Sequence, residues 1–479
     1  MGTYNHGIRV SENATVVPSP AVSTLGPNVF VGIAPVNLAD SPAVNEPIVC
    51  NTWAEFVESF GYSDDWATYG LCAAAYFAFR VYGIGPIVCI NVLDPDTHKT
   101  ALSSTTVELS NGVATVETVG ILKTGLTVVS EESTLVAGTD YELGYDDSGY
   151  LTITSLADVA PESYTVTGYK INPGAVTTSE VIGGVDSSTG AKSGIECIRD
   201  IHPTYGLYPG MIAAPGFSQE AAVAAALVLK TTELNGVYLC EAAIDLDSTN
   251  TTVYSAVEAA KDALGIVSEH AILLWPSVKV GSKVAPFSAA YPAMAAYTDY
   301  ANGNVPSLSP SNQLLNIDAV CTSAGVEIYL DQPEANELNA IGVVTALNRA
   351  GIRAWGNNTA AYPDVTDPKD RWIPCRRFFS WWTNSFIDSY VEEVDQPTSY
   401  RQIMNFVDKE NIKINSYAGA GLMAGGRLTF DIDENPIENI LAGTIIFHEY
   451  LAPYTPAEDI HNVLEFDPTI LYESLNGGE

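Results

Sequence analysis

The stretch VFVGIA, residues 29–34, is an unbroken apolar run that predicts a buried β-strand. Thr52 follows it with Glu55 three positions later, which is the pattern of a capping box at the start of a short helix. Residues 66–82 then predict a second helix, and residues 86–93 predict a second buried strand. Strands that alternate with helices in this way favour a parallel or mixed sheet with helices on its faces.

The alternation of strands and helices resumes after residue 210. The expected strands cover residues 211–214, 236–244 and 271–275, and the expected helices begin near residue 218 and span residues 252–264. Residues 333–350 have helical spacing and are followed by Gly351, which is a common helix end. We therefore expect one long helix there, followed by a strand over residues 352–355.

Residues 100–184 differ in composition from the segments on either side. Thr, Val, Ser, Gly and Tyr dominate, and polar and apolar residues alternate over residues 105–116 and 150–154. Turn residues at 138–140 and 146–149 separate these runs. The pattern predicts a small β domain that is inserted at the outer surface.

A polar turn at residues 364–370 marks the start of a C-terminal domain. We expect its helices at residues 378–394 and 398–414 and its strands near residues 427–432 and 444–450. The fold class is therefore α/β of a mixed α+β type, with extended arms at both ends. The expected units are an N-terminal arm (1–28), a central helix-flanked sheet domain (29–99 and 185–363), an inserted β domain (100–184), a C-terminal α+β domain (364–459) and a C-terminal arm (460–479).

The N-terminal arm is apolar but is interrupted by Pro18, Pro20 and Pro27, so it is too broken to pack alone. An edge strand that folds back on its own domain is the alternative interpretation. The C-terminal arm also has apolar residues without the length of a domain.

Composition excludes several classes of function. The 57 Asp and Glu residues against 21 Lys and Arg give a formal net charge of -36, so the surface repels phosphate and we expect no nucleic-acid partner. Seven scattered cysteines without metal-binding spacing predict reduced core residues, a reducing cytoplasm, no metal and no cofactor. The first ten residues lack the apolar segment of a secretory signal, and no apolar stretch is long enough to cross a bilayer, so we expect no membrane insertion.

The motifs of catalysis are also missing. None of the six histidines lies in a nucleophile motif, and His270 opens an apolar strand, where a structural role is expected. The glycine-rich run GAGLMAGGR, residues 419–427, lacks the ending of a phosphate loop and predicts a tight turn before a strand, where another backbone can approach closely. The acidic run at residues 431–435 lacks the glycine and the closing Glu of a calcium loop. We expect no enzymatic activity.

The basic residues are concentrated near the C-terminus, where ten of the 21 lie between Arg349 and Arg427 and none follows. Residues 371–382, RWIPCRRFFSWW, combine bases with aromatics, and Arg and Trp often anchor protein interfaces. A helix whose aromatics belong to the core is the alternative. We assign no role to Cys375 or to the Trp381-Trp382 pair.

Several segments together resemble the contractile tail sheath proteins of bacteriophages and of the related R-type bacteriocins. They are YNHGIRV (4–10), GIAP (32–35), WAEF (53–56), FG (60–61), GIRAWG (351–356) and PYTPAEDI (453–460). The similarity spans nearly the whole chain apart from the β insertion.

The resemblance implies a structural subunit that stacks in rings, sixfold in symmetry, around an inner tail tube. Contraction of this helical homo-oligomer drives the tube through a bacterial envelope. Baseplate and tail terminator proteins are further implied partners, in a virion or bacteriocin tail that assembles in the host cytoplasm. Arms at both ends would add strands to a sheet in neighbouring subunits, and this suits two apolar termini that cannot fold alone.

The residues expected in the two inter-subunit arms are mostly apolar and lie in strand-like segments at the chain ends. They are Tyr4, Ile8, Val10 and Val16 in the N-terminal arm and Ile460, Val463, Leu464, Ile470, Leu471 and Leu475 in the C-terminal arm, with donated strands at about residues 4–17 and 460–475. The candidate residues that face the tube are Lys409, Lys413, Arg376 and Arg377.

Two other classes remain open. A surface-layer or adhesin-type protein would share the acidity and the β insertion, but it should carry a secretory signal and few cysteines. An α/β hydrolase would share the alternation of strands and helices, but it needs an activated Ser or Cys.

Overall fold

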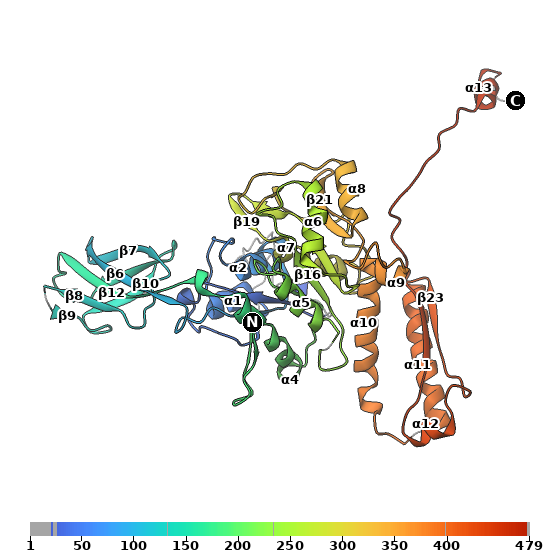
Figure 1. Ribbon diagram of the computed structural model, residues 1–479, viewed down its shortest axis with the longest axis horizontal. Helices are drawn as coiled ribbons and strands as arrows, with labels where there is room; N and C mark the ends of the chain where they lie inside the picture. The colour runs from blue at the N-terminus through green and yellow to red at the C-terminus, as the bar shows by residue number, and fades with distance from the viewer. Residues whose placement is uncertain (1–20, 23–25, 132, 233, 398, 477–479) are drawn as a thin grey trace, which may run out of the picture.

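The computed structural model describes residues 21–22, 26–131, 133–232, 234–397 and 399–476 of the chain. Its centre is an eight-stranded sheet with helices around it (Figure 1). A small β domain projects from one side, a largely helical C-terminal domain stands on the other, and a thin tail leaves the C-terminal side (Figure 1). The expected mixture of helix and sheet is confirmed. The expected N-terminal donated strand, residues 4–17, lies outside the described residues.

The central sheet is parallel except at its two edges. Its strands lie in the order β22 (Ile352–Trp355), β21 (Val343–Asn348), β17 (Ala271–Leu274), β16 (Glu241–Asp245), β15 (Met211–Ala213), β2 (Asn28–Gly32), β5 (Ile87–Asn91) and β3 (Ile48–Cys50). The edge strands β22 and β3 are antiparallel to their neighbours. Parallel strands covered by helices read as continuous apolar runs, and this is why VFVGIA and its counterparts were recognisable.

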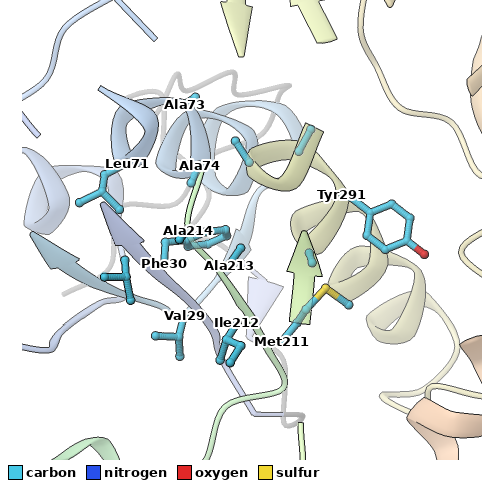
Figure 2. Packing of buried hydrophobic residues seen from close by; sticks show 14 of the residues in the cluster. Val29, Phe30, Leu71, Ala73, Ala74, Met211, Ile212, Ala213, Ala214 and Tyr291 are labelled. Carbon is cyan, nitrogen blue, oxygen red and sulfur yellow. The ribbon is translucent and has the colours of Figure 1, made fainter. Parts of the chain in front are cut away.

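Strands β2 and β15 lie side by side within the main core (Figure 2). Val29 and Phe30 have no solvent exposure there. Leu71 and Ala74 of α2 (Gly70–Ala75) and Tyr291 of α7 (Phe287–Ala301) surround the two strands (Figure 2). Gly70 begins α2 because a Cβ at this position would lie 2.4 Å from the carbonyl oxygen of Pro215. The glycine therefore allows a close approach of the helix to the loop after β15.

The helices begin and end for local reasons. The hydroxyl of Thr52 accepts a hydrogen bond from the amide of Glu55 and so caps α1 (Trp53–Phe60), as expected. The expected helix at residues 66–82 instead begins at Gly70, because the Asp65 carboxylate holds residues 65–68 in a turn. This helix continues as a π-helix, Tyr76–Tyr82. The other helices of the central domain are α3 (Thr178–Ile182), α4 (Ile201–Tyr205), α5 (Ala221–Lys230), α6 (Val257–Leu264) and α8 (Gln332–Ala340).

The prediction of one long helix at residues 333–350 is wrong. Helix α8 ends at Ala340, and strand β21 follows from Val343. Gly342 has φ +73°, a conformation that breaks a helix, and β-branched residues come directly after it. Helical spacing and a buried strand cannot be told apart in so short an apolar run.

Two two-stranded sheets and one three-stranded sheet accompany the main sheet. They are β1 (Ala21–Val22) with β4 (Ile84–Gly85), β13 (Gly184–Val185) with β14 (Lys192–Ser193), and β18 (Ser277–Val280) with β19 (Lys283–Ala285) and β20 (Ala319–Cys321).

The inserted unit is a two-sheet β domain with its own small core. One sheet holds β6 (Lys99–Glu108), β12 (Ser163–Ile171), β8 (Thr127–Ser130) and β9 (Ser133–Thr134), and the other holds β10 (Tyr141–Tyr145), β11 (Tyr150–Ser155) and β7 (Val113–Val119). Its strands end at Ile171, before the expected boundary at residue 184. Val181 of α3 already packs in the core of the central domain.

The C-terminal domain is a pair of long helices beside a two-stranded sheet. Its elements are α9 (Pro368–Arg371), α10 (Ile373–Tyr390), α11 (Tyr400–Gly419), β23 (Gly425–Thr429), α12 (Ile437–Leu441) and β24 (His448–Ala452). Phe378 and Trp382 of α10 pack with Ile414 of α11 in a separate apolar cluster. These aromatics of the basic cluster therefore belong to a core, as the alternative interpretation had it.

Candidate functional site

The sheet of β23 and β24 is the most open β-structure of the C-terminal domain. The two strands are antiparallel, with Gly425 opposite Ala452 and Thr429 opposite His448. Within the described residues no third strand pairs with either of them. Helix α11 packs against β23, and its Asn411 side chain accepts from the Leu428 amide at 2.9 Å and donates to the Leu428 carbonyl oxygen at 3.0 Å. The edge of β23 is therefore partly closed by α11, and within the described residues the outer edge of β24 is the one to which another strand could bond.

The glycines of this sheet serve its own packing. A Cβ on Gly426 would lie 2.4 Å from the carbonyl oxygen of Tyr450 and 3.3 Å from the side chain of Ile414. The close backbone approach expected for the run at residues 419–427 is thus made within the subunit. Gly426 allows β23 to fit between β24 and α11.

A polar network fills the space between this sheet and the two long helices. The Trp382 indole donates to the Glu449 carboxylate at 2.7 Å, and the Tyr390 hydroxyl donates to Glu410 at 2.7 Å. The Lys413 ammonium lies 3.0 Å from Glu410 and 4.4 Å from the centre of the Trp382 ring. Burial raises the pKa of Glu449 to about 7. The network ties β24 to α10 and α11 and makes their packing sensitive to protonation.

The two lysines proposed to face the tube differ in availability. Lys413 contacts the buried Glu410, so its charge is largely engaged inside the domain. The side chain of Lys409 is 55% exposed and lies 3.5 Å from Glu393. Lys409 is therefore the more accessible of the two.

Arg376 and Arg377 do not occupy an open surface. Both are buried, and Arg376 pairs with Asp370 at 3.0 Å. Arg377 makes two hydrogen bonds to the buried Asp299 carboxylate of α7, one of them at 3.2 Å. Their burial contradicts the prediction that these arginines face the tube: the charge of Arg377 joins α10 to α7 of the central domain, and that of Arg376 is engaged by Asp370 of the adjacent helix α9.

Burial acts on both members of this ion pair, and it raises the pKa of the Asp299 carboxyl although Arg377 opposes the rise. Burial by itself lowers the pKa of Arg377, but the Asp299 and Glu241 carboxylates outweigh burial and raise it. The sequence analysis missed Asp299, Glu241, Glu410 and Glu449. Acids within otherwise apolar helix or strand faces are the signal that points to them, since such acids are seldom buried without a partner.

The C-terminal tail after Ala452 carries a row of exposed apolar side chains. Ile460 is 84% exposed and Leu464 is 88% exposed, and Val463, Ile470, Leu471 and Leu475 are also exposed. The expectation of a strand over the whole of residues 460–475 is wrong in its second half, where α13 (Pro468–Leu475) forms. The Asp467 side chain caps this helix and Pro468 stands at its first position, both strong helix starters. The arm residues Tyr4, Ile8, Val10 and Val16 lie outside the described residues.

In residues 26–476, apart from the three single positions that are not described, no cluster of His, Cys, Asp and Glu could hold a metal ion. No described helix has the length and hydropathy to cross a membrane. All seven cysteines are buried and unpaired.

Comparison with known proteins gives the class of the chain. No family model matches it. The tail sheath protein of Burkholderia phage BcepMu is 26% identical over 499 aligned positions, which cover 99% of each chain. The major tail sheath protein of Serratia phage KSP20 is 24% identical over 61% of this chain and 72% of that one.

The fold is shared with solved sheath subunits. A subunit of the sheath complex of the extracellular contractile injection system PVC, in the contracted state, superposes with a TM-score of 0.57 over 98% of this chain and 99% of that chain, at 15% identity. Relatives and fold together confirm the resemblance to the class of contractile tail sheath proteins and support a structural sheath subunit. Within that class, its similarity to the BcepMu sheath protein extends over the whole chain, the β insertion included.

Proposed function

We propose that this chain polymerises as stacked sixfold rings around an inner tail tube and that its contraction drives the tube through a bacterial envelope. Its other partners are baseplate and tail terminator proteins, in a phage or bacteriocin tail assembled in the host cytoplasm. No enzymatic step, nucleic acid, cofactor or membrane insertion is part of this function. The full-length similarity to a phage tail sheath protein supports the proposal.

The observation that carries the proposed linkage is that one chain holds both an open sheet and an exposed apolar tail. The outer edge of β24 has no strand partner within the described residues, whereas the edge of β23 is partly closed by Asn411. The tail offers apolar residues that no part of the described subunit covers. Strand addition would satisfy the backbone groups of both segments, and the tail side chains would set the register.

The shape of the tail divides its proposed role in two. Residues 460–467 have no helix or strand and can adopt the extended form of a donated strand. Helix α13 then presents Ile470, Leu471 and Leu475 to a second site on the neighbour. A head-to-tail contact of this kind builds an open helical assembly rather than a closed dimer. The N-terminal arm, residues 1–17, is the proposed second donor.

The proposed tube contact is carried by Lys409, with Lys413 as a weaker contributor. Each exposed ion pair is worth about 0 to 1 kcal/mol, but repetition along a tube multiplies the effect. An acidic tube surface is the chemistry that would match it.

Electron microscopy of the purified full chain tests the linkage. Deletion of residues 460–479, or of residues 1–17, should abolish sheath-like tubes while the circular dichroism spectrum stays that of a folded subunit. A matched control is Val159→Ser, because Val159 is as exposed as the tail residues but belongs to the inserted β domain, which projects from the opposite side of the central domain to the C-terminal domain (Figure 1). Normal tubes from both deleted chains would refute the arm proposal.

A further inference from the structure

The first residues of the C-terminal tail lie along a cleft before the tail becomes free. The cleft has a volume of about 710 Å³. Its floor belongs to the central domain and carries amide side chains such as Asn312, Asn336 and Asn357. Residues 454–459 form its opposite wall. The tail thus has a root that contacts the body and a distal part that does not.

One ion pair holds this root. The Arg371 guanidinium lies 3.2 Å from the Glu458 carboxylate. Within the described part of the chain, Arg371 is the one ionic partner of Glu458. Among the described residues, the one other polar contact of the root is long, with the Cys375 thiol 3.8 Å from the Tyr454 carbonyl oxygen. The ion pair is therefore the main polar attachment of the root to the body.

Arg371 is oriented before it meets Glu458. Its guanidinium lies 4.4 Å from the centre of the Tyr362 ring and 4.0 Å from that of Trp372. Its Nε donates to Asn358 at 2.8 Å, and Asn358 in turn donates to the carbonyl oxygen of Asn339. A planar cation held by two rings and an amide loses little freedom when it binds a carboxylate.

The root is stiff as well as attached. Pro453 and Pro456 fix the backbone angles of the segment and favour an extended form. No proline occurs between Glu458 and Pro468. The proline-stiffened segment therefore extends to about Glu458, the residue of the ion pair, and the free part of the tail begins at Asp459.

We propose that Arg371 and Glu458 form a clamp that fixes the point at which the C-terminal tail leaves the subunit. The clamp limits the free linker to residues 459–467, which span about 30 Å when extended. Release of the clamp would free residues 453–458 and lengthen the reach by about 20 Å. A longer linker gives each tail more ways to meet a neighbour and loosens the spacing of subunits. This last consequence rests on the proposed sheath function, whereas the clamp itself is intramolecular.

The mobility of a spin label on Ala457→Cys in the free full-length chain measures the clamp directly, and the seven native cysteines do not compete for the label because they are buried. Glu458→Ala should raise the mobile fraction of this label by about two- to fivefold, the effect of losing one exposed ion pair. The mobility of a label on Val463→Cys should not change. The matched control is Asp459→Ala, which removes a neighbouring carboxylate that lines the same cleft without bonding Arg371. Arg371→Lys keeps the charge but loses the planar stacking, and it should mobilise the label at position 457 as Glu458→Ala does.

Equal mobility of the label at position 457 in the otherwise unchanged chain and in the Glu458→Ala and Asp459→Ala variants would overturn the clamp. Electron microscopy of the unlabelled variants then separates the clamp from the proposed function. Sheaths of Glu458→Ala should show a wider spread of subunit spacing than sheaths of Asp459→Ala. A chain that shows the mobility difference but never forms sheaths would retain the clamp and refute the sheath function.

Discussion

Replacing Arg377 by Met should destabilise the chain by about 3 to 5 kcal/mol, because it leaves the buried Asp299 carboxylate without its charge partner. Asp299 is 1% exposed, and the Arg377 guanidinium makes two hydrogen bonds to it. The loss is a large part of the roughly 5 to 15 kcal/mol that stabilises a typical domain. Asp299→Leu should lower stability by a similar amount, since it leaves the buried arginine without its charge partner.

The double variant Arg377→Met with Asp299→Leu distinguishes a buried ion pair from simple packing. Removal of both charges should recover most of the lost stability, because two apolar side chains no longer carry a desolvation cost. Recovery should be incomplete, since Glu241 also lies in the field of Arg377 and loses that support. Its remaining neighbour is His270, whose Nδ1 lies 3.7 Å from the Glu241 carboxylate.

The assay is urea unfolding of the full chain, followed by tryptophan fluorescence and circular dichroism. Trp381 and Trp382 stand on the same helix as Arg377 and report on the junction between the domains. Lys409→Met is the control, because its exposed pair with Glu393 should be worth only about 0 to 1 kcal/mol. A cost below about 1 kcal/mol for Arg377→Met, or a double variant no more stable than the single variants, would refute the reasoning.

Four further outcomes are expected. The pKa of Glu449 is raised above its ordinary 4.5 to about 7, so the folded chain binds this proton more tightly than the unfolded chain, and stability should fall as pH rises from about 4.5 to 7. Glu449→Gln should remove this pH dependence of the unfolding temperature, and an unchanged slope would contradict the assignment. Gly70→Ala should lower the stability measured by thermal unfolding by about 1 to 3 kcal/mol, because the new Cβ would contact the Pro215 carbonyl oxygen. The Cβ of Gly419→Ala would have no neighbour within 4 Å, so this control should be neutral or slightly stabilising. Equal effects of the two variants would count against the close approach. Leu464→Ser combined with Ile460→Ser should prevent sheath assembly without lowering the unfolding temperature, and sheaths of normal length would argue against the tail as donor. Lys409→Glu should weaken co-sedimentation with tubes at low salt more than Lys413→Glu does, and the opposite order would remove Lys409 from the tube contact.

The strands of the central sheet were predictable because they are buried on both faces. In a run such as residues 29–34 neither face of the strand needs polar residues, so the continuous apolar sequence alone indicates a buried strand. Residues 343–348 also form a buried strand, but their apolar residues fit helical spacing as well, and for this reason a helix was predicted there. Gly342, with its positive φ, was the local sign that the helix ends there.

The basic cluster shows what spacing along one helix cannot tell. Arg377 bonds the carboxylate of Asp299, 78 positions earlier in the chain, and no residue near 377 in the sequence indicates that partner. Phe378 and Trp382, four positions apart, did carry a sign of burial, because residues at that spacing share one helix face. The second half of the tail was mistaken for a strand although Asp467 and Pro468 have the order of a helix start. That signal was local and could have been used.

The central claim is that the tail of one subunit completes the β23–β24 sheet of another. A cryo-electron microscopy reconstruction of the assembled sheath, at a resolution that separates strands, tests it most directly. The account predicts residues 460–467 as an added strand on an edge of the β23–β24 sheet of a neighbouring subunit, with α13 seated beyond it. Finding both edges of that sheet unpaired in the assembled sheath, with the tail docked on its own subunit, would contradict the account.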